Sequence, residues 1–578
     1  MYLAELYIKD FRRLSDATVK FAPGLNVIVG PNNIGKTAVV DALRALLAGA
    51  DDPYPRFDKE DIHIPKSGTQ ATEIRFEYIF RGLSLDDEAD FLHAIRKNSA
   101  GKTEAVLGVS YGEIDQAGRL RPRRWCGEHE DISMTSGMLE NLRSVYLQPL
   151  RDAEQGLRPG RTSQLSRLLQ LLSDETGKTG IADALRTLDD ELKTKQPIVD
   201  TQEAITNRHV SMLGVQLAQT LEVGLSASDF QKLASRLSIL VDTFEIDSNG
   251  LGYNNLIFMA VVLSELVKNA DASYRSLIVE EPEAHLHPQL QAVLLRYLSS
   301  MQSAEGDKPV QVFVTSHSPN FASIAKLDSI TCLVDSGTKV DLFHPRDVSF
   351  AKDKREKLER YLDVTRAELF FARRVIFVEG AAELMMVSLL ARKCGKDLRD
   401  HGVSLISVEG LNFDSFMPLF GTDAIKIPVA VLTDADPQKV VGADGSLEAV
   451  YPELGDTIAL SDNAKAMKAQ EDEFVKVFCG LKTFEYDFAL FEQNRTAMIA
   501  ALKELHPRIG NQIELDVRSA GGNAAKAEAI FRGMFERPQN NVQKGRYAQI
   551  LAAKIEDDKL DIVVPNYIAL AISHVTRS

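Results

Sequence analysis

One stretch near the start of the chain has the glycine and lysine spacing of a phosphate-binding loop. Residues 30–37 read GPNNIGKT and fit G-x-x-x-x-G-K-T, between a β-rich apolar run at 26–29 and a helical apolar pattern at 39–47. The glycines let successive backbone N–H groups face a phosphate at the helix N-terminus. Lysine and threonine at the end of such a loop reach the β/γ-phosphates and Mg²⁺. The pattern predicts a nucleoside triphosphate site formed by Asn32, Gly35, Lys36 and Thr37.

A pair of acids follows a second apolar run. The apolar run 277–279 predicts a buried strand, and Glu280 and Glu281 follow directly at its end. After a phosphate-binding loop, two acids in this position predict that Glu280 is linked to Mg²⁺ and that Glu281 polarises the attacking water. His285 and His287 have the side chains of metal ligands, but no further ligand lies near them in the sequence. We interpret them as residues of a dimer-contact loop.

Acids also follow several predicted strands in the last third of the chain. Residues 375–378 form an apolar strand followed by Glu379, and Glu383 falls in the first turn of the next helix. A later apolar strand ends at Asp434 and Asp436. Strand–helix repeats of this length predict a parallel sheet, with the acids at the carboxyl ends of its strands. Four carboxylates at one edge repel one another unless cations neutralise them, and hard oxygen ligands suit Mg²⁺ or Mn²⁺.

Three further charged residues stand near the starts of predicted elements after this group. Glu485 lies on a short strand or at a helix start, and Lys544 and Arg546 fall in the first turn of an apolar helix. Cations in a first helical turn oppose the helix macrodipole. A phosphate held there would reconcile these charges with the helix.

The elements around these residues predict an α/β chain with two centres. Residues 2–29 indicate two strands, 3–11 and 18–30, around a turn, and apolar stripes between 160 and 240 predict three or four amphipathic helices. Those helices must bury their stripes on each other or on a second subunit. The expected domains are an ATPase in two parts at 1–160 and 241–345, a helical insertion at 161–240 that is a candidate for dimerisation, a connector at 346–372, and a second α/β domain at 373–578.

Length and composition narrow the class of protein. The chain has 578 residues, 44% of them hydrophobic and 26% charged, as in soluble globular proteins of several domains. The first residues lack an apolar signal core, and the longest apolar run (256–263) is too short to cross a bilayer. The four cysteines show no C-x-x-C spacing. A cytoplasmic location is therefore expected. A net charge of −15 argues against uniform coating of nucleic acid. Two arginine-rich stretches, 119–124 and 151–167, read equally well as solvated surface or as a DNA track.

The first centre resembles the SMC/RecF class of ABC-type ATPases. A strand ending I-x-x-F-R before the phosphate-binding loop carries the likeness, which implies that Arg12 lies near the nucleotide phosphates. It further implies that Gln148 responds to the presence of Mg²⁺ and the γ-phosphate, and that His317 contacts the γ-phosphate. A plain surface glutamine and a structural histidine remain the alternatives. Gly250 and Gly252 begin a helix at the place where the class has its signature motif, which caps the partner subunit's nucleotide. The sequence here differs from the usual LSGGQ.

The second centre resembles the Toprim domain through V-E-G-x-x-E and a later D-x-D. An SMC/RecF-type ATPase split by helices and followed by Toprim resembles the OLD (overcoming lysogenization defect) family of nucleases, over essentially the whole chain. That family acts on DNA with divalent metals and includes phage-interference proteins and the Gabija nuclease subunit. The resemblance implies a helical dimerisation element, a catalytic lysine at Lys544, and metal ligands at Glu379, Glu383, Asp434, Asp436 and Glu485.

The predicted activity is ATP-binding, metal-dependent cleavage of DNA. Two Mg²⁺ or Mn²⁺ ions about 4 Å apart would activate water and stabilise the leaving oxygen, Lys544 would offset charge on the phosphate, and an ATPase homodimer would gate the DNA. One alternative is a non-cutting repair clamp of the RecF type, against which the complete set of carboxylates argues. Another is a strand-passage or primase enzyme, and a topoisomerase would need a separate cleavage domain for which the chain has no room. A helicase partner cannot be inferred from one chain.

Overall fold

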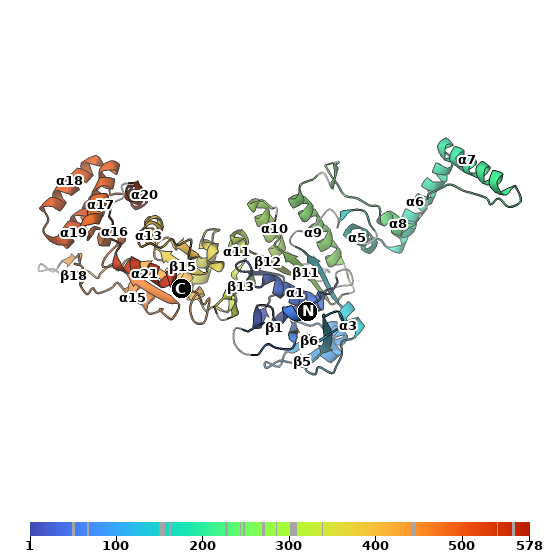
Figure 1. Ribbon diagram of the computed structural model, residues 1–578, viewed down its shortest axis with the longest axis horizontal. Helices are drawn as coiled ribbons and strands as arrows, with labels where there is room; N and C mark the ends of the chain where they lie inside the picture. The colour runs from blue at the N-terminus through green and yellow to red at the C-terminus, as the bar shows by residue number, and fades with distance from the viewer. Residues whose placement is uncertain are drawn as a thin grey trace.

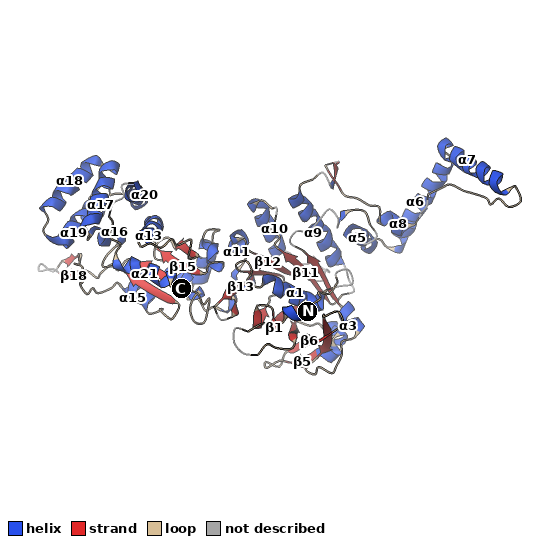
Figure 2. Ribbon diagram, in the orientation of Figure 1, coloured by secondary structure: helices blue, strands red, loops and turns tan. Residues whose placement is uncertain are grey.

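The computed structural model describes the chain except for residues 49–52, 66–68, 149–156, 161–162, 226–228, 243, 247–248, 269–271, 285, 301–308, 338, 442–445, 540, 558–560 and 578. Figure 1 shows an elongated molecule, with a helical arm at one end, a head around α1 in the middle and a second unit at the other end. Both the head and the second unit combine sheets with helices (Figure 2), which confirms the predicted α/β fold class.

Two sheets form the head, and the side chains of α1 (Lys36–Leu47) share one core with strands from both. The first sheet is antiparallel, in the order β2-β1-β4-β6-β5, with β7 paired to β6. Its strands are β1 (Tyr2–Phe11), β2 (Leu14–Lys20), β4 (Ile74–Arg81), β5 (Ile95–Lys97), β6 (Thr103–Ile114) and β7 (Leu120–Cys126). The second sheet has the order β14-β13-β3-β12-β11-β8 and is parallel apart from β14. Its strands are β3 (Leu25–Val29), β8 (Leu142–Leu147), β11 (Tyr274–Glu280), β12 (Gln311–Ser316), β13 (Ile330–Asp335) and β14 (Val340–Phe343).

The run predicted as one strand at 18–30 is divided between these two sheets. β2 ends at Lys20 and β3 begins at Leu25, and the bend between them contains Gly24 with a φ of 81°. The side chain of Asn26 fixes the bend, because its Oδ1 accepts from the Ala22 N–H at 2.7 Å. The prediction of two strands before the phosphate-binding loop is therefore wrong, since the segment forms three.

Helices cover the other face of the second sheet. They are α9 (Leu251–Lys268), α10 (Pro288–Ser300) and α11 (Pro319–Ile324). By length and composition alone, α9 is the one helix among the described residues that could cross a membrane. Its Met259, Val262 and Leu266 are buried in the core of the head, so we assign it as a core helix.

The predicted helical insertion forms the arm at one end of the molecule (Figure 1). It contains α5 (Gln164–Leu172), α6 (Glu175–Lys193), α7 (Gln196–Leu213) and α8 (Phe230–Ala234). α5 packs on α9, whereas α6 and α7 have no buried residue within the chain. Their apolar positions are thus left open, with Ile205 47% and Met212 75% exposed.

A connector joins the head to the second unit through one continuous core. It consists of α12 (Lys354–Tyr361) and the 3₁₀ helix η6 (Arg366–Phe370). η6 packs on α11 of the head and on β16 (Val403–Ser407) of the second unit. Phe370 and Phe377 belong to the same buried cluster as Phe321 of the head.

The second unit is built on a four-stranded parallel sheet. Its order is β16-β15-β17-β20, with β15 (Arg374–Val378), β17 (Val429–Thr433) and β20 (Val475–Cys479). The helices of this unit are α13 (Ala381–Lys393), α14 (Phe413–Phe416), α15 (Asp462–Lys468), α16 (Phe484–Ala489), α17 (Glu492–Leu505), α18 (Pro507–Ser519), α19 (Gly522–Phe535), α20 (Lys544–Asp557) and α21 (Asn566–Thr576). Apart from short 3₁₀ helices, the other elements of the described chain are α2 (Leu85–Asp90), α3 (Ser136–Glu140), β9 (Leu240–Val241), β10 (Phe244–Glu245), β18 (Val440–Val441) and β19 (Leu447–Glu448).

Candidate functional site

The phosphate-binding loop between β3 and α1 has a backbone that glycine makes possible. Gly30 and Gly35 have φ values of 154° and 120°. A Cβ on Gly30 would lie 2.8 Å from the Leu333 carbonyl oxygen, so a side chain there would collide with the neighbouring strand. The loop therefore wraps closely around the start of α1, where backbone N–H groups are free of partners within the helix.

Lys36 closes the loop from inside. Its Nζ donates to the carbonyl oxygens of Gly30 at 2.7 Å and Pro31 at 3.0 Å. Burial lowers the pKa of Lys36, against the opposing charges of Glu281 and Glu283. The side chains of Asn32 and Thr37 are exposed at the loop mouth. A phosphate would give the buried ammonium an anionic partner in place of neutral carbonyl groups.

Glu280 at the end of β11 is a buried acid in an acidic neighbourhood. It is 4% exposed, and its Oε1 has no hydrogen-bond partner among the described residues. Burial, with the charges of Asp41 and Glu281, raises the pKa of Glu280 to about 7. An unpartnered carboxylate oxygen beside other acids fits a divalent cation such as Mg²⁺.

Glu281 and His317 face each other across adjacent strands. β11 and β12 run parallel, with Glu280 opposite Thr315. His317 Nδ1 lies 3.4 Å from Glu281 Oε1, and Glu281 has a φ of 46°. The strand order therefore brings together the two residues predicted to contact water and the γ-phosphate.

Glu283 is a member of this group that the sequence analysis did not identify. It is 8% exposed, and its Oε1 accepts from Ser316 Oγ at 2.7 Å and from the His317 N–H at 3.0 Å. It ties the loop after β11 to the loop after β12. The third acid in the E-E-P-E run was the available signal.

Gln148 and Arg12 occupy different surroundings. Leu147 pairs with Val279, so Gln148 follows β8 beside the end of β11 where Glu280 stands. Arg12 donates to Asp61 Oδ1 and Asp41 Oδ2, both at 2.7 Å. Burial opposes the charge of Arg12, but these carboxylates raise its pKa. Asp41 lies on α1, one turn beyond Thr37, which links Arg12 to the phosphate-binding helix.

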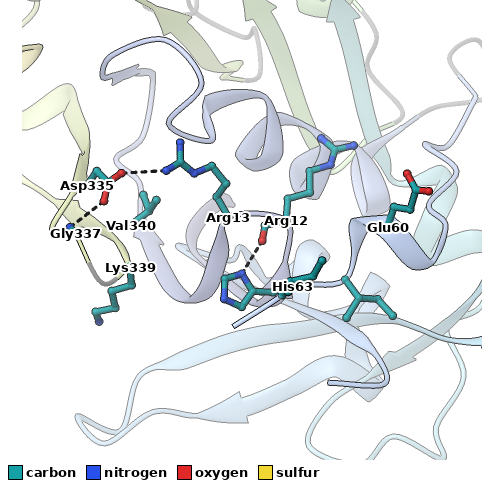
Figure 3. Close-up of a pocket in the computed structure, with 10 residues that line it drawn as sticks. Arg12, Arg13, Glu60, His63, Asp335, Gly337, Lys339 and Val340 are labelled. Atoms are coloured by element: carbon teal, nitrogen blue, oxygen red, sulfur yellow. Dashed lines mark hydrogen bonds and ion pairs between the residues drawn. The ribbon is translucent and has the colours of Figure 1, made fainter. Parts of the chain in front are cut away.

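Figure 3 shows the pocket beside this arginine. The side chains of Arg12 and Arg13 diverge, and Arg13 reaches Asp335, with 3.0 Å between nitrogen and oxygen. The carbonyl oxygen of Arg12 lies 2.6 Å from His63 Nδ1. Arg13 also contacts the carbonyl of Asn33, so this pocket opens beside the phosphate-binding loop.

The predicted signature helix is α9, and its first turn lies at the surface. Gly250 is exposed, Gly252 is partly exposed, and Tyr253 is 58% exposed. Asn254 is buried beneath this turn and donates to the Ile246 carbonyl at 3.0 Å. The buried Asn254 thus anchors the exposed first turn of α9 to the segment before it. His285 of the predicted dimer-contact loop, and Arg151 and Arg161 of the second arginine-rich stretch, lie outside the described residues.

At the other centre, acids gather at the carboxyl ends of β15 and β17. Glu379 Oε1 accepts from Thr433 Oγ1 at 2.7 Å and from the Asp434 N–H at 2.8 Å. Glu383 Oε2 accepts from the Gly380 N–H at 3.1 Å, which caps α13. The sheet edge and the start of α13 therefore place these three acids around one small cavity.

The charges of these acids act on one another. Burial, followed by the charges of Glu379 and Glu485, raises the pKa of Asp434 well above its ordinary value. Burial and the charge of Glu485 also raise the pKa of Glu383. Among the described residues, no group of three acidic, histidine or cysteine side chains is closed around a metal position as it stands. The donor set nevertheless fits a divalent cation, whose charge would offset this mutual repulsion.

Lys544 joins the acids from the first turn of α20. Its Nζ lies 3.2 Å from Oε2 of Glu485, which is 3% exposed at the start of α16. Burial opposes the charge of Lys544, but the carboxylates of Glu485 and Asp434 raise its pKa. The ammonium group is therefore held in its charged form at the edge of the acidic cavity.

Asp436 stands apart from this group. It is exposed, it is not among the residues that line the cavity, and its charge acts on Lys482. Tyr567 of α21, which the sequence analysis missed, lines the cavity with Glu379 and Asp434. Burial and the charge of Asp487 raise the pKa of Tyr567. No local motif marks this tyrosine, because α21 reaches the site only through the folding of the last helices.

These two centres define a class: a P-loop ATPase head joined to a Toprim-type acidic site. Residues 1–110 and 138–322, half of the chain, match the AAA ATPase domain family, and the protein belongs to it. Residues 370–436 match the TOPRIM domain described as overcoming lysogenization defect protein-like. The predicted resemblance to OLD proteins is confirmed.

Curated relatives extend over most of the chain. The OLD nuclease of Thermus scotoductus is 28% identical over 392 residues, which cover 65% of this chain and 71% of that protein. Endonuclease GajA of Bacillus cereus strain HuB5-5 is 23% identical over 582 residues, with 82% of each chain covered. The DNA replication and repair protein RecF of Erwinia tasmaniensis is 50% identical over 112 residues, but these cover only 19% of this chain and 28% of that protein.

Proposed function

We propose that this protein is an ATP-binding, metal-dependent DNA endonuclease of the OLD type. The observation that carries the proposal is the convergence of Glu379, Glu383, Asp434 and Glu485 with Lys544 at one sheet edge. Carboxylates that crowd together and raise the pKa of Asp434 and Glu383 have no evident purpose in folding. They suit a site that takes cations and an anionic phosphodiester.

The acids would hold the divalent ions, Mg²⁺ or Mn²⁺. Glu379, Glu383, Asp434 and Glu485 are the core ligands of this proposal, with Asp436 as an outer one. Such ions activate water and stabilise the leaving 3′-oxygen when bound. Lys544 would bind the scissile phosphate and offset the charge that develops on it. Tyr567 would bound the cavity on the side of α21.

The head would bind ATP with Mg²⁺ through Asn32, Gly35, Lys36, Thr37 and Glu280. Glu281 would orient the attacking water, and His317, at 3.4 Å from it, would contact the γ-phosphate. Gln148 beside Glu280 and Arg12 behind α1 would complete the site. The exposed helix start at Gly250 and Gly252 would cap a partner subunit's nucleotide, which makes a homodimer part of the proposal.

The cellular setting follows from the same proposal. The protein would work in the cytoplasm on DNA, in phage defence or DNA processing. The helical insertion at 161–240 would supply a dimer contact between the two halves of the ATPase at 1–160 and 241–345. The connector at 346–372 would join them to the nuclease domain at 373–578.

Plasmid cleavage with Mg²⁺ or Mn²⁺, with and without ATP, tests the function. We expect Asp434→Ala and Glu379→Ala each to abolish cleavage while ATP hydrolysis stays near that of the parent protein, because the two centres lie on separate sheets. Asp423→Ala, an exposed acid of the same domain, is the matched control and should cut normally. Cleavage that survives Asp434→Ala would place the nuclease site elsewhere.

A non-cutting clamp of the RecF type is the second candidate. The short match to RecF favours it, although that match leaves the Toprim residues unexplained. If the parent protein leaves plasmid and linear DNA intact under all metal and nucleotide conditions, the clamp becomes the better account.

A further inference from the structure

A groove runs between the head and the second unit, at the end of the Toprim sheet opposite the acids. It has a volume of about 850 Å³. One wall contains Pro31 and Asn32 of the phosphate-binding loop and the end of β13. The other wall is formed by Arg373 and Arg374 at the start of β15 and by the loops before β16 and β17. Figure 1 shows β13 and β15 on the two sides of this boundary.

Cations dominate the charged lining of this groove. Five Arg and Lys side chains line it against two acids, Asp335 and Asp400, in a chain whose net charge is −15. The five are Arg13, Arg373, Arg374, Arg399 and Lys426. A local excess of positive charge in an acidic protein indicates an anionic ligand.

Three of these cations have no partner in the described part of the chain. Arg13 pairs with Asp335 at 3.0 Å, and Arg374 donates to the carbonyl oxygens of His401 at 2.8 Å and Arg577 at 3.1 Å. No side-chain hydrogen bond or ion pair holds Arg373, Arg399 or Lys426 to any described residue. Each belongs to a segment that directly precedes a strand of the parallel sheet, so the sheet aligns the three along one edge.

We propose that this groove is a second DNA-binding site, which holds the phosphate backbone without reading sequence. The inference rests on the proposed nuclease function and adds a place where the substrate is gripped away from the cut. The groove is lined by residues of both the head and the second unit, so it is open along the boundary between them. Unpaired Arg and Lys side chains along an open groove bind phosphates by charge and position the polymer.

The groove and the acids contact different stretches of DNA. β15 begins at Arg374 in the groove and ends one residue before Glu379. Five residues of parallel strand span about 16 Å. A duplex bound in the groove is therefore held one strand length from the acids. It remains bound in the groove after the cleaved phosphate has left the acidic site.

Binding of a fluorescent mixed-sequence DNA duplex in EDTA, where no metal-dependent cleavage occurs, tests the groove. The test protein carries Arg373→Gln, Arg399→Gln and Lys426→Gln together. The control carries the same loss of charge at exposed cations outside the groove, Lys97→Gln, Lys195→Gln and Arg508→Gln. ATP hydrolysis and the thermal unfolding midpoint of both proteins verify their folding.

We expect the groove variant to bind DNA on the order of tenfold more weakly than the control. Because each phosphate contact contributes about 0.9 to the dependence of log Kobs on log salt, the slope should fall by about 2 to 3. Equal affinity and slope in the two variants would overturn the proposal while leaving the nuclease function intact. Lost binding of a fluorescent ATP analogue, with DNA binding unchanged, would also overturn it. Failure of the parent protein to cut DNA in Mn²⁺ would count against the nuclease function alone, since groove binding is read without metal.

Discussion

Lys544 Nζ lies 3.2 Å from Glu485 Oε2, where the charges of Asp434 and Glu383 also act on it. The two residues come from the first turns of different helices, α20 and α16. The contact places a charged ammonium group, itself 47% exposed, beside a carboxylate that is 3% exposed. It is the point at which an anionic substrate would meet the acids.

Lys544→Ala should lower the rate of DNA cleavage by about 10²-fold or more if the ammonium stabilises the transition state. Metal binding should persist, because the carboxylates remain. Single-turnover cleavage and isothermal titration with Mn²⁺ measure the two effects. Arg508→Ala removes an exposed cation of the same domain and should have little effect. Equal losses in the two variants would reduce Lys544 to a general electrostatic role.

Glu281→Gln should bind ATP and hydrolyse it very slowly, because the amide cannot polarise the attacking water. Lys36→Ala should instead lose both binding and hydrolysis, since the phosphates lose their cation. Filter binding of labelled ATP and phosphate release separate the two results. Hydrolysis by Glu281→Gln at the parent's rate would reject Glu281 as the water-orienting residue.

The local parts of both centres could be predicted from sequence. Short motifs mark the phosphate-binding loop, the acids after β11 and the strand ends at Glu379 and Asp434. The local backbone of each motif determines which chemistry its residues can perform. The parallel sheet then brings the strand ends together, because parallel strands end at one edge.

Contacts between distant segments could not be predicted in this way. Tyr567 reaches the cavity from α21, and its neighbours in sequence carry no motif. Arg13, in the turn between β1 and β2, meets Asp335, which lies 322 residues further along the chain. The division of residues 18–30 between two sheets depends on pairings with strands far along the chain.

A variant lacking residues 165–235 should be monomeric, whereas the parent protein should be the proposed homodimer. α6 and α7 bury no side chain within the chain, which leaves their apolar positions for a second subunit. Multi-angle light scattering measures the oligomeric state. Because a deletion can unfold its surroundings, Met212→Ser with Leu213→Ser provides a milder test at exposed positions. A dimer that survives both changes would assign the contact to another surface.

Acid should weaken the head through His344. Its Nε2 accepts from the Lys20 N–H at 3.0 Å, so it must be neutral, and burial followed by the charge of Arg346 lowers its pKa from 6.5 to about 4. The unfolded chain therefore binds a proton at His344 more readily than the folded chain does. The neutral, buried His344 contributes about 3 kcal/mol at most to the free energy of unfolding, and this contribution is present above pH 6.5 and lost as the pH falls toward 4. Thermal unfolding of His344→Gln should show a smaller loss in that window. An identical pH dependence would exclude His344 as a cause.

Arg366 should couple the two centres. It lies on η6, which packs on α11 just after His317, and it donates to the Ser407 carbonyl at 2.9 Å and pairs with Glu409 at 2.6 Å. The N–H of Gly410, the next residue, donates to the Glu379 carbonyl at 2.7 Å. A shift of α11 with nucleotide state would thus reach the backbone of a proposed metal ligand.

Arg366→Lys keeps the charge but cannot make both contacts at once. We expect it to reduce the ratio of cleavage rates measured with and without ATP toward one, while ATP hydrolysis stays near the parent's value. Because Arg366 is buried, Glu409→Gln serves as a second variant at a 64% exposed side chain. If the two residues act through their ion pair, the double variant should lose no more coupling than either single one. A ratio that stays at the parent's value in both single variants would show that nucleotide state reaches the nuclease site by another route.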